Sequence, residues 1–313
     1  MQSPRVLVVA GTHGNEINGP WLLEQWERFP FLLDTRGFDV VPIIGNPAAY
    51  ARGSRYLDRD LNRSFQPDLL RQAELAQRDA SVKVDLEVQR AHDLVSRYGP
   101  DGIEACDLVV DLHSTTSAMG NCLVLYGRRP ADLALASLLQ RRLGLPIYLH
   151  ENDPAQHGFL AERWPCGLAI EVGPVPQMVR HNVILRQTRL ALQEVFAACS
   201  EVLAGEARYP KELIIHRYVR NLDYPRTSSG LEPVCFHLDR QGSDWRFLRF
   251  GDPIFERADG SCVVYEGEDG LVPIFINEAA YAEKSIALTL TSRECWPLSS
   301  EWTEALASIL LTR

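Results

Sequence analysis

Along the first two-thirds of the chain, short apolar runs alternate with longer segments that have helical spacing. Apolar runs of four or five residues bounded by Gly, Pro or polar residues are typical of buried strands. Such runs occur at 6–10, 40–44, 108–112, 122–126, 146–149 and 168–172. Apolar faces at helical spacing predict helices from residue 18 onward, over about 69–98, over 131–143 and over about 177–203. Strands that alternate with helices predict an α/β fold with helices on the faces of a sheet.

The pattern changes after Gly205. The apolar runs become shorter and are separated by turns such as Ala-Asp-Gly and Glu-Asp-Gly. They predict strands at 213–219, 253–255, 262–265 and 271–276, followed by a helix that starts near Ser300. We therefore expect two domains, a larger one over residues 1–205 and a smaller, β-rich one over residues 206–313.

Composition and charge narrow the classes of partner. The formal net charge of −9 argues against nucleic acid and anionic membranes. No apolar run reaches membrane-spanning length, and the run at 6–10 is too short for a signal segment. The seven cysteines are widely spaced, never form a C-x-x-C pair and fit a reducing compartment. We expect a cytoplasmic protein.

Three of the predicted strands end at or next to a His or a Glu. The first leads through Gly11 to His13 and Glu16, the second ends at His113, and the third contains Glu171. The carboxyl ends of strands in an open α/β sheet line one crevice, so these side chains are expected to converge. Two imidazoles and one carboxylate leave a coordination position open, which is the pattern of a catalytic zinc site.

The same residues have simpler interpretations. A His and a Glu three residues apart often lie on the surface by chance, and Glu171 can belong to a structural ion pair. Asp111, two residues before His113, is expected on the same strand face, where it can accept the second N–H of a ligand histidine. Five further histidines are interpreted as surface or hydrogen-bonded interior residues; they are His92, His150, His181, His216 and His237.

Four arginines lie within residues 52–63, which we call the arginine segment. Arginine suits fork-like pairing with a carboxylate, and Asn62 adds a neutral donor. For Arg52 and Arg59 a solvated ion-pair network with Asp58 and Asp60 is the better interpretation. Any anionic substrate of this acidic chain is expected to bind at this segment.

Six motifs together resemble the aspartoacylase and succinylglutamate desuccinylase family, with its aspartoacylase branch most similar. They occur in the family's order along nearly the whole chain and read GTHGNE (11–16), NP (46–47), RYLDRDLNR (55–63), DLHSTTSAMG (111–120), IEVGP (170–174) and NEAAY (277–281). The resemblance implies a mixed sheet flanked by helices, as in zinc carboxypeptidases, and a β-rich C-terminal domain that closes the substrate pocket.

The resemblance also implies roles for individual residues. One zinc ion per subunit would be held by His13, Glu16 and His113. Glu171 would be the general base, and Arg55 would polarise the scissile carbonyl. Substrate would be bound by Asn62, Arg63 and Tyr281, with support from Asp60, Asp111 and Glu278. The implied reaction is hydrolysis of an N-acyl-L-amino acid, with N-acetyl-L-aspartate as the preferred substrate.

One segment departs from the aspartoacylase pattern. The Tyr and Arg that usually read the aspartate side chain are replaced by His157 and Ala161, and Arg163 is the nearest candidate to substitute. Alternatives therefore stay open: another N-acyl amino acid, such as an aromatic one or succinylglutamate, a metallocarboxypeptidase, or a non-enzymatic metal- or ligand-binding protein. The sequence does not determine the oligomeric state, and a homo-oligomer stays open.

Overall fold

The computed structural model describes residues 3–153, 156–228 and 230–311. One large mixed sheet forms the centre, with strand order β13-β14-β7-β5-β4-β6-β3-β1-β2. Its strands are β1 (Arg5–Ala10), β2 (Asp39–Ile44), β3 (Leu108–Ser114), β4 (Gly120–Tyr126), β5 (Ile147–His150), β6 (Cys166–Gly173), β7 (Glu212–Asp223), β13 (Val272–Ile274) and β14 (Ile286–Pro297). The expected mixed sheet flanked by helices is confirmed.

Most of the helices cover one face of this sheet. These are α1 (Asn18–Arg28), α5 (Pro130–Leu143), α6 (Asn182–Leu203) and α7 (Ser300–Leu311). The opposite face is covered by α4 (Leu86–Tyr98), next to α3 (Pro67–Arg78). Strand β1 shows why both faces are apolar: Val6 and Val8 face the first helical layer, while Leu7 and Val9 face the second.

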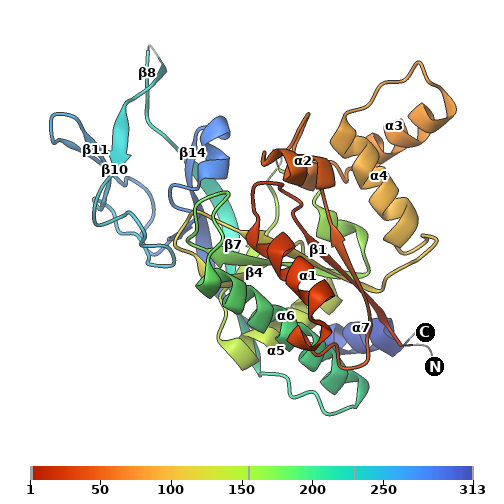
Figure 1. Ribbon diagram of the computed structural model, residues 1–313. Helices are drawn as coiled ribbons and strands as arrows, with labels where there is room; N and C mark the ends of the chain where they lie inside the picture. The colour runs from red at the N-terminus through yellow and green to blue at the C-terminus, as the bar shows by residue number, and fades with distance from the viewer. Residues whose placement is uncertain (1–2, 154–155, 229, 312–313) are drawn as a thin grey trace.

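A smaller β-rich part lies at one end of the large sheet (Figure 1). It contains the sheet β10 (Val234–Phe236), β11 (Pro253–Arg257) and β12 (Cys262–Val264), and the pair β8 (Arg226–Thr227) and β9 (Gly230–Leu231). Its own apolar core includes Leu248, Phe255 and Leu290. The expected β-rich C-terminal part is therefore present. Strand β7 pairs with β5, however, so the large sheet continues past residue 205, and the division at that residue stays a prediction.

Four expectations about single elements were wrong or incomplete. The segment expected to be helical over 69–98 is two helices, because Asp79 ends α3 and its carboxylate accepts the Ser81 N–H in a turn. Helix α6 begins at Asn182 rather than near 177, because 178–181 is hydrogen-bonded to the segment around Asn18. The sequence analysis missed the twelve-residue strand β14 and the short helix α2 (Pro47–Arg52).

Short 3₁₀ helices carry parts of the site. They are η1 (Pro30–Leu32), η2 (Leu61–Arg63), η3 (Leu160–Arg163) and η4 (Ala279–Lys284). Of these, η2 forms the end of the arginine segment and carries Asn62 and Arg63, and η4 carries Tyr281 from the C-terminal part. No helix among the described residues is long and apolar enough to cross a membrane.

Candidate metal centre and substrate pocket

Three adjacent strands bring the expected metal ligands together. Strand β3 lies between β1 and β6, and His113 on β3 is the register partner of Glu171 on β6. His13 and Glu16 follow β1 in the turn that leads to α1. Gly11 adopts a positive φ of 66° in this turn, and a Cβ at Gly14 would lie 2.2 Å from the backbone of Ala49. Glycine is therefore required for the close approach of this turn to α2.

His13, Glu16 and His113 form a compact and buried group, which we call the metal-binding group because its side chains are of the types that hold a metal ion. Each offers one ligand atom, and these atoms lie within 4.8 Å of one another. The Glu16 carboxylate lies 2.6 Å from Nδ1 of His13 and 3.1 Å from Nδ1 of His113. Burial alone would raise the pKa of Glu16, but His13 and His113 lower it well below its usual value. The predicted convergence of these three side chains is confirmed.

Both histidines are oriented by a second carboxylate. Asp60 lies 3.0 Å from Nε2 of His13, and Asp111 lies 2.7 Å from Nε2 of His113. Asp111 also accepts a hydrogen bond from the Thr12 hydroxyl at 2.7 Å. These contacts hold the Nε2 edge of each ring and leave both Nδ1 atoms facing Glu16, which is the arrangement that supports ligand histidines in metal sites.

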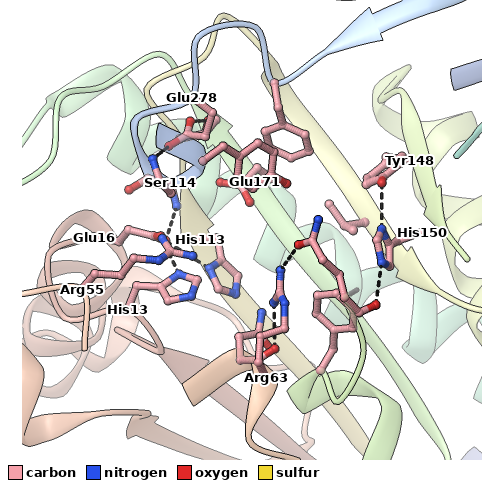
Figure 2. Close-up of a pocket in the computed structure, with 18 of the residues that line it drawn as sticks. His13, Glu16, Arg55, Arg63, His113, Ser114, Tyr148, His150, Glu171 and Glu278 are labelled. Carbon is pink, nitrogen blue, oxygen red and sulfur yellow. Dashed lines mark hydrogen bonds and ion pairs between the residues drawn. The ribbon is translucent and has the colours of Figure 1, made fainter. Parts of the chain in front are cut away.

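Arg55 and Glu171 face the same pocket (Figure 2). The Arg55 guanidinium contacts Glu16 at 3.3 Å and Asp60 at 3.1 Å. Burial alone would lower the pKa of Arg55, but these two carboxylates outweigh it and raise the pKa. Burial raises the pKa of Glu171 well above its usual value. A carboxyl group with a raised pKa beside a metal-binding group has the character of a general base or acid.

The pocket continues away from the metal-binding group toward Arg63 (Figure 2). The Arg63 guanidinium lies 4.1 Å from the centre of the Phe159 ring and donates to Gln156 at 2.6 Å. Its Nε atom is buried and has no hydrogen-bond partner among the residues that the structure describes. The amide oxygen of Asn62 accepts from the Leu160 N–H at 2.9 Å, so its NH₂ group is the one available to a ligand.

The far end of the pocket is mainly aromatic. It is lined by Val124, Tyr126, Tyr148, His150, Phe159 and Phe275. The Tyr148 hydroxyl lies 2.8 Å from Nδ1 of His150, whose Nε2 lies 3.1 Å from the backbone oxygen of Gln156. Burial lowers the pKa of His150 to about 4, so this imidazole is neutral at pH 7.

The C-terminal part completes the pocket with Tyr281 and Glu278. Glu278 accepts hydrogen bonds from the Thr116 N–H at 2.9 Å and the Ser117 N–H at 3.2 Å, and also contacts the Thr115 hydroxyl. These bonds connect the loop after His113 to the 3₁₀ helix η4. The sequence therefore correctly predicted that this part of the chain contributes to the pocket.

Several predicted residues lie outside the pocket lining. Asp60 and Asp111 stand behind the histidines, as their supporting role requires. Arg163 is not among the lining residues that the structure describes, and neither are His157 and Ala161. The substrate role of Arg163 stays a prediction.

The sequence analysis missed the aromatic end of the pocket. His150 was interpreted only as a surface or hydrogen-bonded interior residue, whereas it is hydrogen-bonded and also lines the pocket. A signal was available, because Tyr148 and His150 are two residues apart on β5 and therefore share one strand face. For Gln156, in a loop, no pattern in the sequence indicated a role.

Comparisons with known proteins agree with this architecture. Residues 2–199 match the family model described as "Succinylglutamate desuccinylase/Aspartoacylase catalytic domain", and residues 211–293 match that described as "AstE/AspA barrel-sandwich hybrid domain". A "Probable aspartoacylase" from Prochlorococcus marinus (strain MIT 9313) is 54% identical over 310 residues, covering 99% of both chains. One from Synechococcus sp. (strain CC9605) is 50% identical over 312 residues, again covering 99% of both.

Solved structures show the same fold. Murine aminoacylase 3 superimposes with a TM-score of 0.83 at 34% identity, covering 95% of this chain and 98% of that chain. A succinylglutamate desuccinylase from Chromobacterium violaceum gives a TM-score of 0.62 at 16% identity, covering 93% and 85%, which is a likeness of fold alone. With both family models matched in order, the chain belongs to the succinylglutamate desuccinylase/aspartoacylase family of hydrolases that act on N-acyl amino acids.

Proposed function

We propose that this protein is a zinc-dependent amidohydrolase that removes the acyl group from an N-acyl-L-amino acid. The observation that carries the proposal is the buried group of His13, Glu16 and His113, with a carboxylate behind each imidazole. Two imidazoles and one carboxylate are the donor set of catalytic zinc sites in hydrolases. When bound, Zn²⁺ lowers the pKa of water to about 7 and polarises a carbonyl group.

The chain's own residues supply the remaining parts of an acyl-transfer site. Glu171 faces the metal-binding group and is placed to accept a proton from the attacking water and to deliver it to the leaving amine. Arg55 is placed to donate to the carbonyl oxygen of the scissile amide as negative charge develops there. Its ion pairs with Glu16 and Asp60 hold the guanidinium in place before substrate binds.

Arg63 and Asn62 are the proposed anchors for the α-carboxylate of an anionic small-molecule substrate. Stacking on Phe159 and the bond to Gln156 fix the plane of the Arg63 guanidinium, and within the described parts of the chain its Nε–H has no partner. A preoriented guanidinium with a free donor suits a carboxylate. Tyr281, from the C-terminal part, lines the same pocket and is proposed to direct its hydroxyl toward substrate.

N-acetyl-L-aspartate is the first proposed substrate. Relatives that are 50% and 54% identical over nearly the full chain carry the name "Probable aspartoacylase", which supports this choice. Aspartate has a second carboxylate. To bind it, the pocket needs a hydrogen-bond donor or a cation in addition to Arg63 and Asn62. Arg163 is the candidate in the sequence, although it is not among the described lining residues.

An N-acyl amino acid with an aromatic side chain is the second candidate. The specific observation in its favour is the far end of the pocket, where Tyr126, Tyr148, Phe159 and Phe275 surround a neutral His150. Aromatic rings stabilise an aromatic or apolar group by burial and ring contacts, and they offer no charge to a second carboxylate.

The deciding experiment combines metal analysis with hydrolysis of a panel of N-acyl amino acids. Wild-type protein is expected to contain about one zinc per chain and to cleave at least one member of the panel. His13→Ala is expected to lose both the metal and the activity, while Leu311→Ala, an exposed substitution far from the pocket, retains both. Faster cleavage of N-acetylaspartate supports the first substrate, and faster cleavage of N-acetylphenylalanine supports the second. Full activity in metal-free protein contradicts the proposal.

A further inference from the structure

The arginine segment is attached to the rest of the protein through one buried carboxylate. Glu87 lies in the first turn of α4 and is 1% exposed. It accepts hydrogen bonds from three consecutive backbone N–H groups: Leu57 at 2.7 Å, Asp58 at 3.1 Å and Arg59 at 3.2 Å. These three residues lie between Arg55, on one side, and the anchors Asn62 and Arg63, on the other.

The same carboxylate also reaches the turn that carries the metal ligands. Glu87 accepts a fourth hydrogen bond from the side-chain amide of Asn46 at 3.0 Å. Asn46 in turn caps α2 through Ala49 and donates its backbone N–H to the oxygen of Gly11, two residues before His13. One carboxylate therefore connects the arginine segment with the loop beside the metal-binding group.

Contacts in the opposite direction strengthen this connection. The Asp58 carboxylate accepts the backbone N–H of Leu86, the first residue of α4, at 2.9 Å. An unpaired N–H in the first turn of a helix needs such an acceptor, and α4 has no side-chain cap from Asp85. The arginine segment thus caps α4, while α4 supplies the carboxylate that binds the arginine segment.

Glu87 is not among the pocket-lining residues and has no ion-pair partner within the described parts of the chain. All four of its contacts are hydrogen-bond donors, and together they occupy both carboxylate oxygens. Without this buried carboxylate, three backbone N–H groups and the side-chain amide of Asn46 would lose their acceptor, which is unfavourable.

We propose that Glu87 is a positioning residue, which acts on catalysis by fixing the backbone between Arg55 and Arg63. The inference rests on the proposed function, because it assigns these two arginines to the scissile carbonyl and to the α-carboxylate. Glu87 itself does not touch substrate. Its carboxylate sets the spacing and direction of two guanidinium groups that must act on the same small molecule.

Glu87→Gln is the sharpest test, because glutamine has the size of glutamate but replaces one acceptor oxygen with an NH₂ group. That NH₂ group would face N–H donors, so part of the network must break. We expect faster hydrogen–deuterium exchange at the amides of residues 57–59, a lower kcat and a higher KM. The expected loss in kcat/KM is about 10- to 100-fold, the size that follows misplacement of a site by about 1 Å.

Asp132→Asn is the matched control. Asp132 is another buried carboxylate on a helix, α5, and accepts the backbone N–H of Gly167 at 2.9 Å on a different part of the molecule. We expect it to destabilise the fold as much as Glu87→Gln, with kcat and KM within about twofold of wild type at a temperature where both variants are folded. This comparison separates positioning from a general loss of stability.

Asp58→Ala provides a second variant if Glu87→Gln does not fold, because Asp58 is exposed. It removes the reciprocal cap of α4, so we expect the same direction of change in exchange and KM, with a smaller effect of about two- to fivefold. The inference is overturned if the amides of residues 57–59 exchange at the wild-type rate in both variants. It is also overturned if these amides exchange faster but kcat and KM stay at their wild-type values. Wild-type protein inactive on every N-acyl amino acid instead contradicts the proposed function, and the exchange at residues 57–59 still decides whether Glu87 holds the segment.

Discussion

Two residues of the arginine segment, Arg55 and Arg63, have different surroundings, and this difference predicts different kinetic effects. Arg55 pairs with Glu16 and Asp60 beside the metal-binding group, whereas Arg63 stacks on Phe159 farther along the pocket. We expect Arg55→Ala to lower kcat by about 10²–10³-fold, as for loss of an oxyanion donor. Arg63→Ala should mainly raise KM, because it removes binding that ground state and transition state share.

Steady-state kinetics on the best substrate of the panel measure this difference. Arg52→Ala is the control, because Arg52 belongs to the same segment but is exposed and does not line the pocket. If Arg55→Ala and Arg63→Ala both change KM alone, the role given to Arg55 is wrong.

His216 predicts a pH dependence of stability. It is 7% exposed, no described residue forms a hydrogen bond with its Nδ1, and burial together with Arg293 lowers its pKa to about 4. In the unfolded chain the pKa is about 6.5, so between pH 6.5 and 4 the unfolded state binds a proton that the folded state does not. The contribution of His216 to the free energy of unfolding is therefore present above pH 6.5 and is lost as the pH falls toward 4, by roughly 3 kcal/mol.

The measurement compares wild type with His216→Phe, which keeps the ring contact with Trp245. As the pH falls from 6.5 to 4, the free energy of unfolding of wild type should decrease relative to that of His216→Phe. The buried groups Asp132 and Asp244, whose pKa values burial raises to about 6, change stability in the opposite direction, but they are present in both proteins and cancel in the difference. A pH-independent difference would show that the fold does not lower the pKa of His216.

At the scale of elements, the strands that end at the metal-binding group could be predicted from the sequence because each is buried on both faces. Strands β1, β3 and β6 are near-continuous apolar runs, and a His or Glu at the end of such a run stands out. The predicted ends differ from the observed ones by one or two residues. Because the carboxyl ends of strands in such a sheet line one crevice, the sequence was enough to predict that His13, His113 and Glu171 lie close together.

Other elements could not be predicted from the sequence, and the physical reason differs from one element to the next. Strand β14 alternates between leucine and threonine only at 288–291 and then continues through Arg293 and Glu294, whose charged side chains are not typical of a buried strand. Helix α6 starts late because of long-range hydrogen bonds from Asn18, which no local propensity reports. The role of Glu87 depends on backbone donors thirty residues away, and a glutamate in the first turn of a helix normally indicates only helix-dipole stabilisation.

Helix α7 offers a test at the element scale. It comes from the end of the chain but packs on α5 and α6, and Leu306 is fully buried in their common core. We expect Leu306→Ala to lower the free energy of unfolding by about 2–5 kcal/mol, because it removes a buried side chain and leaves a cavity. Leu311→Ala, in the same helix but 51% exposed, should change it by less than about 0.5 kcal/mol. Chemical denaturation measures both, and equal effects would mean that α7 does not contribute to the core.

At the scale of the whole molecule, one large sheet contains strands from both the N-terminal and the C-terminal part of the chain, and both parts line the pocket. Strands β7 and β14 extend the sheet beyond β5, and the segment before β14 returns to the metal-binding group with Glu278 and Tyr281. The protein has a formal net charge of −9, yet the arginine segment faces the pocket at this junction. We therefore expect an anionic substrate to bind through these local guanidinium groups, against the average field of the protein.

Glu278 is the residue on which this junction depends. Its carboxylate accepts from the N–H and hydroxyl groups of Thr116 and Ser117, and its other oxygen accepts the N–H of Ala280 at the start of η4. Glu278→Gln places an NH₂ group among these donors, so we expect η4 to move away from the loop after His113. Because Tyr281 lies on η4, kcat/KM should fall at least about tenfold.

Glu294→Gln tests whether that loss is specific. Glu294, on β14, also accepts from several donors, including Arg217 and Trp296, but it does not line the pocket. Both variants weaken hydrogen bonds in the C-terminal part, so both should lower the unfolding temperature by a few degrees. Only Glu278→Gln should change the kinetics. Of the two glutamates, only Glu278 forms hydrogen bonds from the C-terminal part to the loop that follows His113. Equal losses of activity in the two variants would mean that the C-terminal part supports the catalytic strands through the sheet rather than through this contact.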